Sequence, residues 1–154
     1  MEISIGDLIP FIIESNMIEG IYRSPTDLEI IAHKKLLLTE TLTVPAVEAF
    51  VAGVARAPLR TGVGMDVTVG NHTPPRGGPE IENMLRSVLA VANAGQTPFR
   101  VHQAYENLHP FMDGNGRSGR AIWLWQMMKQ IQDQGVLSRK FLHTYYYQSL
   151  SAER

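Results

Sequence analysis

The chain lacks three features that would each assign it to a broad class of protein. Its 154 residues include no cysteine, which excludes disulfide bonds and thiolate metal sites. The formal net charge is −1 at pH 7 and no face is obviously basic, whereas nucleic-acid binding usually needs a basic patch that neutralises phosphates. No apolar run approaches the roughly 20 residues of a membrane-spanning helix. We therefore expect neither a nucleic-acid partner nor a membrane partner.

The amino-terminal stretch MEISIGDLIPFIIE does not resemble a secretory signal peptide. It begins with an acid rather than a basic region, and Pro10 interrupts its apolar part. With 44% of its residues apolar, a chain of this length can form one domain with a substantial core. We expect a single cytoplasmic domain over residues 1–154.

Most of the chain has the hydrophobic spacing of amphipathic helices. The clearest example is Ile81–Ala92, where apolar residues recur at i, i+3, i+4 and i+7 and Gly95 follows as a stop. Ser24, Pro25 and Asp27 form a typical helix start, with a cap, a proline and an acid in the first turn. The pattern predicts an all-α fold. The expected helices cover residues 8–20, 25–38, 44–55, 81–94, 99–108, 117–134 and 138–150.

Residues 59–78 differ from the rest because they are rich in glycine and proline. The only regular pattern there is an alternation of Val63, Met65, Val67 and Val69, which predicts a short β-hairpin. An isolated hairpin in a helical protein is barely stable alone and leaves a strand edge open. Two interpretations follow: a surface connector, or a docking edge for an extended peptide.

The stretch HPFMDGNGRSGR, residues 109–120, gathers many polar groups in a short span. Pro110 and Gly114 argue against a continuous helix, so one helix is expected to end near residue 108 and another to begin at 115–117. Gly114 and Gly116 allow a sharp turn and a close approach of the backbone to a ligand. The exposed amides at the start of the second helix then form an anion site, which the helix dipole strengthens.

The charged side chains of this stretch match phosphate chemistry. Arg117 and Arg120 are three residues apart on one helix face, and two cations at a helix start are costly unless an anion is present. Asp113 supplies a carboxylate where a magnesium ligand is needed, and His109 is a base near physiological pH. These groups predict nucleotide phosphoryl chemistry, with an ordinary charged loop as the alternative.

The same stretch resembles the signature of the Fic-domain family, HxFx(D/E)GNGRxxR, at every defined position. The segment VGNHTPP, residues 69–75, is similar to the one that follows the family's target-binding flap, and TYYYQSL, residues 144–150, to a late helix beside the nucleotide pocket. The resemblance implies a Fic-type helical bundle with residues 59–78 as the flap. It also implies binding of Mg²⁺ and ATP, and transfer of AMP to a hydroxyl group of a target protein.

The resemblance further implies roles for several residues of the stretch 109–120, which contains the catalytic loop and the start of the next helix. His109 would be the general base that accepts the proton of the target hydroxyl. Asp113 would hold the magnesium ion that bridges two phosphates. Gly114, Asn115 and Gly116 would form the anion hole, to which Asn115 also contributes its side chain.

The remaining nucleotide and target contacts are implied in the same way. Arg117 would contact the β-phosphate, Arg120 would contact the γ-phosphate, and Tyr146 would stack near the adenine ring. The flap positions that would receive an extended segment of the target are Val67, Thr68 and Val69.

A second motif, SNMIEG at residues 15–20, resembles the family's inhibitory motif (S/T)xxxE(G/N). Ser15 and Glu19 are four residues apart and therefore share one helix face. The resemblance implies that Glu19 reaches the site, pairs with Arg120 and blocks productive placement of the γ-phosphate. The alternative is a solvent-facing acid that closes a helix before Gly20.

The principal hypothesis is therefore a self-inhibited protein adenylyltransferase. One alternative is removal of AMP from a modified protein, because in some relatives the inhibitory glutamate positions a water molecule. Another is an ATP-binding regulatory or toxin–antitoxin module with little transfer activity. The sequence does not identify the target protein, and it leaves self-modification and homo-oligomer formation open.

Overall fold

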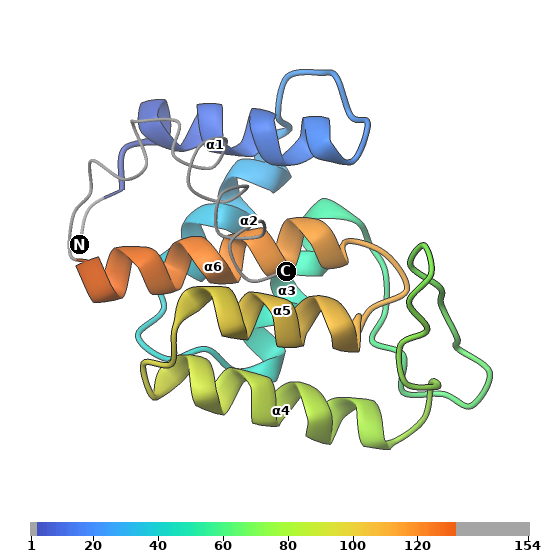
Figure 1. Cartoon of the computed structure of the whole chain (residues 1–154). Coiled ribbons are helices and arrows are strands. Elements are labelled where there is room, and N and C mark those ends of the chain that lie inside the picture. The colour runs from blue at the N-terminus through green and yellow to red at the C-terminus, as the bar shows by residue number, and fades with distance from the viewer. Residues whose placement is uncertain (1–2, 132–154) are drawn as a thin grey trace.

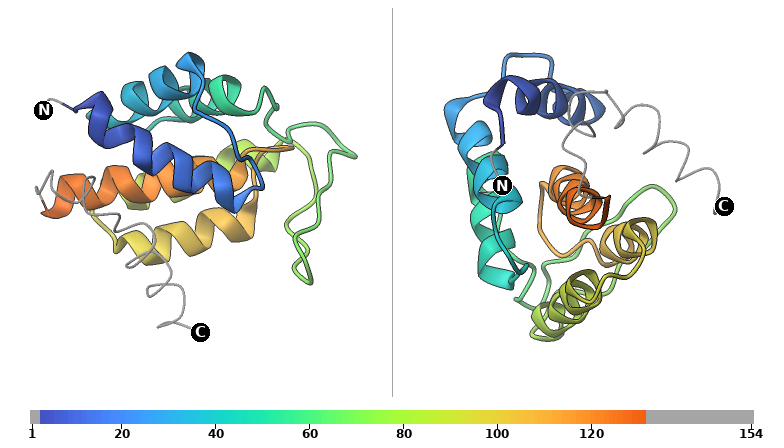
Figure 2. Two further views of the ribbon diagram at one scale, coloured as in Figure 1. Left: turned by 90° about the horizontal axis from the view of Figure 1, so that it is seen from above. Right: turned by 90° about the vertical axis from the view of Figure 1, so that its left-hand side faces the viewer.

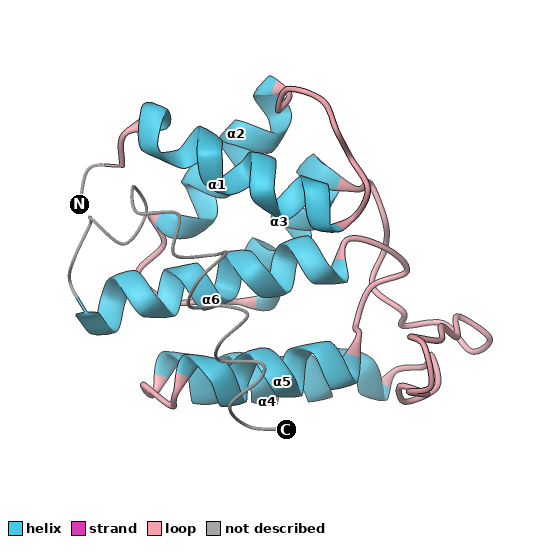
Figure 3. Ribbon diagram, turned by 45° about the horizontal axis from the view of Figure 1, so that its top comes forward, coloured by secondary structure: helices cyan, strands magenta, loops and turns pink. Residues whose placement is uncertain are grey.

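The computed structural model describes residues 3–131 of the chain and contains six α-helices in that range (Figure 1). No named strand occurs between residues 3 and 131, so the prediction of an all-α fold is confirmed (Figure 3). The helix expected at residues 138–150 lies outside the described residues. The helices are α1 (Ile5–Ile18), α2 (Asp27–Leu37), α3 (Val44–Val54), α4 (Glu80–Asn93), α5 (Pro98–Leu108) and α6 (Asn115–Ile131).

Helix α6 lies at the centre of the bundle. It contacts α1, α2, α3 and α5, and the view along its axis shows the other helices arranged around it (Figure 2). Residues 121–125 are all buried, so this helix is covered on every side. Residues 121–125 are Ala, Ile, Trp, Leu and Trp, so this segment of α6 is apolar on every face and belongs in the core. The start of α6, which carries the polar motif, is therefore positioned by packing along the whole helix.

Helix α2 begins two residues later than the sequence pattern predicts. The cap is Thr26 rather than Ser24, because the Thr26 hydroxyl accepts from the Glu29 amide at 3.1 Å and the Glu29 carboxylate accepts from the Thr26 amide at 2.7 Å. This capping box satisfies two amides at once, which a cap at Ser24 cannot do.

The carboxylate of Glu29 connects α1 to α2. It accepts hydrogen bonds from Arg23 at 2.7 Å and from Asn16 at 3.3 Å, and Glu29 is almost completely buried. Burial alone would raise the pKa of Glu29. The hydrogen bonds from Arg23 and from the Thr26 amide outweigh that effect and lower the pKa to about 2.

Helix α1 begins at Ile5, three residues before the start of the expected helix, and continues through Pro10. Proline removes one helical hydrogen bond. Leu8, Phe11 and Ile12, close to Pro10, are nonetheless buried against the bundle and hold the helix in place. None of the helices in residues 3–131 combines the length and the apolar character that a bilayer span requires.

Residues 59–78 form an irregular loop instead of the predicted β-hairpin. Within them only Val69 and His72 pair with each other, as an isolated bridge. The alternation that suggested strands does not bury one face, since Val63 is 91% exposed. The carbonyls of Met65 and Pro75 accept hydrogen bonds from the Arg60 guanidinium, so they do not take part in a strand ladder.

The Glu29 network predicts how stability depends on pH. The pKa of Glu29 is depressed in the folded state, so its contribution is present above the ordinary pKa near 4.5 and is lost as pH falls toward 2. Between pH 5 and pH 2 the wild type should therefore lose on the order of 3 kcal/mol more of its free energy of unfolding than Glu29→Gln does. Urea unfolding at several pH values measures this difference. The control Glu40→Gln changes an exposed glutamate and should follow the wild type; identical acid profiles for all three proteins would contradict the assignment.

Candidate functional site

The catalytic loop begins where α5 ends, at a residue with an unusual backbone conformation. His109 has φ 49° and ψ 63°, in the left-handed region, and its amide closes the helix on the Tyr105 carbonyl at 2.9 Å. A residue that precedes proline is disfavoured in the right-handed helical conformation, and Pro110 follows directly. Left-handed conformations are costly for residues other than glycine and persist only where the surroundings hold them. The chain thus turns sharply at the candidate base.

The loop after His109 is closed by the side chain of Asn115. Its Oδ1 accepts from the Phe111 amide and its Nδ2 donates to the Phe111 carbonyl, both at 2.8 Å. Both polar atoms of this side chain hold the loop, and its contribution to the anion hole stays a prediction. Phe111 is buried and anchors the same turn.

Gly114 occupies a position that only glycine fits. Its φ is +81°, and a Cβ atom there would lie 2.9 Å from the Cβ of Ala55 and 3.3 Å from a methyl group of Val51. Its amide donates to the Asp113 carboxylate at 2.7 Å. The turn therefore packs against α3 and leads directly into α6.

Gly116 lies in the first turn of α6, directly against the carboxylate of Glu19. A Cβ atom on Gly116 would collide with Oε1 of Glu19 and would lie 3.1 Å from the Arg120 guanidinium. The first amides of a helix have no acceptor within the helix, and the helix dipole is positive there. An anionic group therefore stands at the place where the sequence predicts an anion site.

Arg120 holds this carboxylate and is itself held by α1. Its Nη2 donates to Glu19 at 2.8 Å and to the Ser15 carbonyl at 2.9 Å, and its Nε donates to the Ser15 hydroxyl at 2.9 Å. The Arg120 side chain is 3% exposed, whereas that of Glu19 is 38% exposed. The structure thus brings together Ser15, Glu19 and Arg120, as the two motifs predict.

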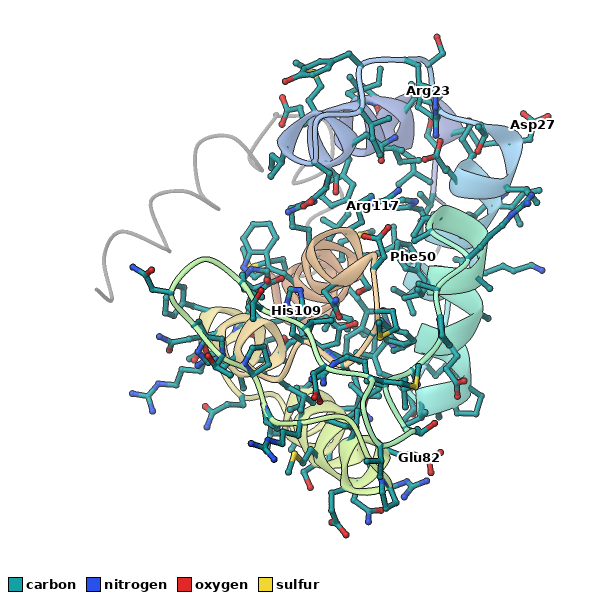
Figure 4. All side chains as sticks on the ribbon, turned by 90° about the vertical axis from the view of Figure 1, so that its right-hand side faces the viewer. Arg23, Asp27, Phe50, Glu82, His109 and Arg117 are labelled. Atoms are coloured by element: carbon teal, nitrogen blue, oxygen red, sulfur yellow. The ribbon has the colours of Figure 1, made fainter. Side chains whose placement is uncertain are left out.

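Arg117 bonds to different helices from those that Arg120 contacts. Its Nη1 donates to the Val54 carbonyl at 2.8 Å and lies 3.9 Å from the Glu29 carboxylate, so the side chain points toward α2 and α3 (Figure 4). Its Nε is buried and has no hydrogen-bond partner in the described part of the chain. The contact of Arg117 with a β-phosphate stays a prediction.

The imidazole of His109 is half-buried near the flap (Figure 4). Burial lowers its pKa below the ordinary value, and the positive charge of Arg60 lowers it further, while the backbone at Glu106 and the Glu19 carboxylate act in the opposite direction. Its Nδ1 is buried without a hydrogen-bond partner among residues 3–131. A neutral imidazole of this kind is able to accept a proton at neutral pH.

Asp113 is exposed at the edge of the loop. No group of three or more histidine, cysteine, aspartate or glutamate residues within the described range could hold a metal by itself. Magnesium is commonly bound through one or two carboxylates together with the phosphates of a nucleotide. A single exposed carboxylate beside an anion site fits that donor set.

Two hydroxyl groups that the sequence does not mark as functional hold the turn at Gly114 in place. Tyr105 on α5 and Ser118 on α6 share a hydrogen bond of 2.6 Å, and the Ser118 hydroxyl also donates to the Gly114 carbonyl at 2.8 Å. Both residues are buried. Ser118 occupies an undefined position of the motif, so no sequence signal points to its role.

Glu106, another residue without a sequence signal, lies under the same site. Burial raises its pKa to about 7, with the Arg120 charge opposing this shift and the Glu19 charge adding to it. Its Oε1 is buried without a hydrogen-bond partner within residues 3–131 and would contact any Cβ atom on Gly119. Glu106 is therefore a third ionisable group that interacts electrostatically with Glu19 and Arg120.

The predicted docking residues lie on the outer part of the flap. Thr68 and Val69 are exposed and Val67 is half-buried. The His72 ring shares a hydrogen bond of 2.8 Å with the Asn107 carbonyl, which ties the flap to the end of α5 close to His109. The structure thus places the flap near the candidate base, whereas Tyr146 lies outside the described residues.

One comparison with known proteins identifies a family. The family model described as the Fic/DOC family matches residues 26–127, about two thirds of the chain. The matched range runs from the cap of α2 into α6 and includes the flap and the catalytic loop. It does not include Ser15 or Glu19. A comparison with curated proteins gives no match.

Replacing Asp113 tests whether it holds a metal ion with a nucleotide. Asp113→Asn keeps an oxygen that can accept from the Gly114 amide but removes the charge. It should weaken ATP binding in the presence of Mg²⁺ by about tenfold or more, the effect of losing one contact to a charged group of roughly 1.5 kcal/mol. Calorimetry with and without Mg²⁺ measures the change. Asp27→Asn alters an exposed aspartate at the start of α2 and serves as the control; an unchanged magnesium requirement in Asp113→Asn would place the metal elsewhere.

Proposed function

Because the chain belongs to the Fic/DOC family, we propose that it transfers the AMP moiety of Mg²⁺-ATP to a hydroxyl group of a protein and that Glu19 inhibits this transfer. The observation that carries the proposal is the position of the Glu19 carboxylate, which pairs with the buried Arg120 at the start of α6. Site and family agree: the site accepts an anion, and the family includes nucleotide transferases. Here the anion comes from the chain itself.

In the proposed reaction the oxygen of the target hydroxyl attacks the α-phosphorus of ATP. The bond from that phosphorus to the oxygen shared with the β-phosphate breaks, pyrophosphate leaves, and the hydroxyl proton passes to His109. The amides at the start of α6 bind phosphate oxygens without reorganising, which favours the charge that develops in the transition state. Asp113 would hold a magnesium ion, which would neutralise phosphate charge.

The two arginines of the motif have different roles in this proposal. Arg120 contacts the γ-phosphate once Glu19 has left, because both anions use the same guanidinium. Arg117 positions the helix start, since it bonds the Val54 carbonyl and lies near Glu29. The inhibited state is one in which a carboxylate substitutes for a phosphate at Arg120.

The flap is proposed to bind an extended segment of the target. The amide and the carbonyl of Val69 are both bonded to His72, so this residue has little backbone left for a partner. A target strand would pair instead with the backbone of Val67 and Thr68, the two residues that precede Val69. The side chain of Val69 would then provide an apolar contact.

Removing the inhibitory carboxylate should activate the protein. Glu19→Gly frees Arg120 and should raise AMP transfer by roughly 5- to 150-fold, which corresponds to a coupling of about 1–3 kcal/mol. The measurement is incorporation of labelled AMP into the protein itself and into proteins of a lysate. Glu40→Gly, a loss of an exposed glutamate, should behave as the wild type.

The double variant Glu19→Gly with Arg120→Ala separates inhibition from a general loosening of the site. It should resemble Arg120→Ala alone, because the γ-phosphate contact is lost in both. If Glu19→Gly transfers no more AMP than the wild type on any acceptor, Glu19 is only a helix-end acid. Release of AMP from a modified protein by the wild type would support the reverse reaction instead.

His109 should be required for transfer but not for binding. In the Glu19→Gly background, His109→Ala should lower transfer by roughly 10²- to 10⁴-fold, the usual effect of losing a general base, with ATP affinity nearly unchanged. The rate should rise with pH as His109 loses its proton, and this rise should lie at lower pH than for an ordinary imidazole, because the pKa is lowered. A rate profile with its rise above the ordinary histidine pKa would exclude His109 as the base.

A further inference from the structure

Arg60 is a completely buried arginine at the start of the flap, and it contacts the end of α5 and the catalytic loop. Its guanidinium donates to four backbone carbonyl groups and to no carboxylate among the described residues. Two acceptors belong to the end of α5: the His109 carbonyl at 2.6 Å from Nε and the Leu108 carbonyl at 2.9 Å from Nη2. The other two belong to the flap: the carbonyls of Met65 at 3.1 Å and Pro75 at 2.8 Å, both from Nη1.

The backbone of Arg60 joins the same two segments. Its amide donates to the Pro110 carbonyl at 2.9 Å, and its own carbonyl accepts from the Gly78 amide at 2.9 Å. The first of these bonds lies beside His109, and the second closes the far end of the flap. A single residue therefore ties together the base of the flap, its interior and the loop that carries the candidate base.

Burying the Arg60 guanidinium costs free energy, so its four hydrogen bonds have to compensate for that cost. Burial disfavours the charged guanidinium and lowers its pKa, and the nearby Asp66 opposes this only in part. Asp66 itself accepts from the Gly77 amide, so it belongs to the same network without bonding to Arg60. A hydrophobic residue could fill the space but could not satisfy four carbonyls. The planar guanidinium sets these carbonyls in a fixed relative geometry, as an ammonium group would not.

We propose that Arg60 is a positioning residue that sets the flap and His109 in one geometry, so that a target bound on the flap presents its hydroxyl to the His109 imidazole. This inference rests on the proposed transfer to a flap-bound target. In-line attack tolerates only small displacements, and the flap and the base come from segments about 40 residues apart. Arg60 is the group that bonds directly to both.

The Arg60 charge has a second, separable effect. Arg60 and His72 both lower the pKa of the His109 imidazole, in addition to burial, while Glu19 and the backbone at Glu106 raise it. Arg60→Lys keeps a positive charge but loses the planar arrangement of donors. Arg60→Met loses both. The two variants thus distinguish positioning from charge.

The experiment compares these variants in the Glu19→Gly background, with Arg86→Lys on the exposed side of α4 as a matched control. Arg60→Lys should lower the rate of AMP transfer to a protein acceptor by roughly 10- to 100-fold, with ATP affinity within about twofold of the control. NMR titration should show the His109 pKa nearly unchanged in Arg60→Lys and raised in Arg60→Met. Transfer at the control rate in Arg60→Lys, or a proportional loss of ATP affinity, would overturn the positioning role.

Hydrogen exchange tests the inference without any transfer activity. Arg60→Lys should speed exchange of the Gly78 and Val69 amides in the flap and of the His109 amide together, by a similar factor. Faster exchange in one segment alone would show that Arg60 does not couple them. If Glu19→Gly transfers no AMP, the proposed function fails, and the exchange and titration data still decide the role of Arg60. If Arg60→Met does not fold, Arg60→Lys alone gives the decision.

Discussion

The structure of the site depends on pairing three guanidinium groups that are buried in one small domain. A buried positive charge is strongly unfavourable unless hydrogen bonds or an anion compensate it. Arg60 is compensated by four carbonyls, Arg117 by one carbonyl and the neighbouring Glu29, and Arg120 by Ser15 and Glu19. The partners of Arg60 and Arg117 are backbone groups or a buried carboxylate, so they form part of the fold.

Among these three arginines, Arg120 is the one paired with a partly exposed carboxylate. The Glu19 side chain is 38% exposed, and it lies at the end of α1, outside the range that the family model matches. In the proposed function an anion from solvent, the γ-phosphate of ATP, replaces it. The same physical requirement, an anion for a buried guanidinium at a helix start, therefore accounts for both nucleotide binding and its inhibition in the proposed function.

The candidate base is positioned by hydrogen bonds to its backbone, one of them from the buried Arg60 guanidinium. His109 is held in a left-handed conformation by the bond of its amide to Tyr105 and by the Arg60 bond to its carbonyl. Tyr105 also supports the glycine turn through Ser118. These contacts connect α5, the loop and α6, so the strained residue is stabilised from three directions. This network fixes the backbone of His109 relative to the start of α6.

The sequence alone determined the features that depend on neighbouring residues. The 3.6-residue period predicted the helices, and the motif predicted a turn, a helix start and an anion site at residues 109–120, because these follow from local backbone chemistry. The spacing of Ser15 and Glu19 predicted a shared helix face. The family resemblance added the pairing of Glu19 with Arg120.

Only the tertiary structure decided where the long polar side chains go. Arg117 and Arg120 are three residues apart, yet they point to different helices, because the partners they find lie 63 and 101 residues away in the chain. The flap is a loop rather than a hairpin, and two of its carbonyls, those of Met65 and Pro75, accept from the buried Arg60 instead of from a neighbouring strand. Arg60 carries no local signal at all, since its role arises from four acceptors that approach one another only after the helices have packed.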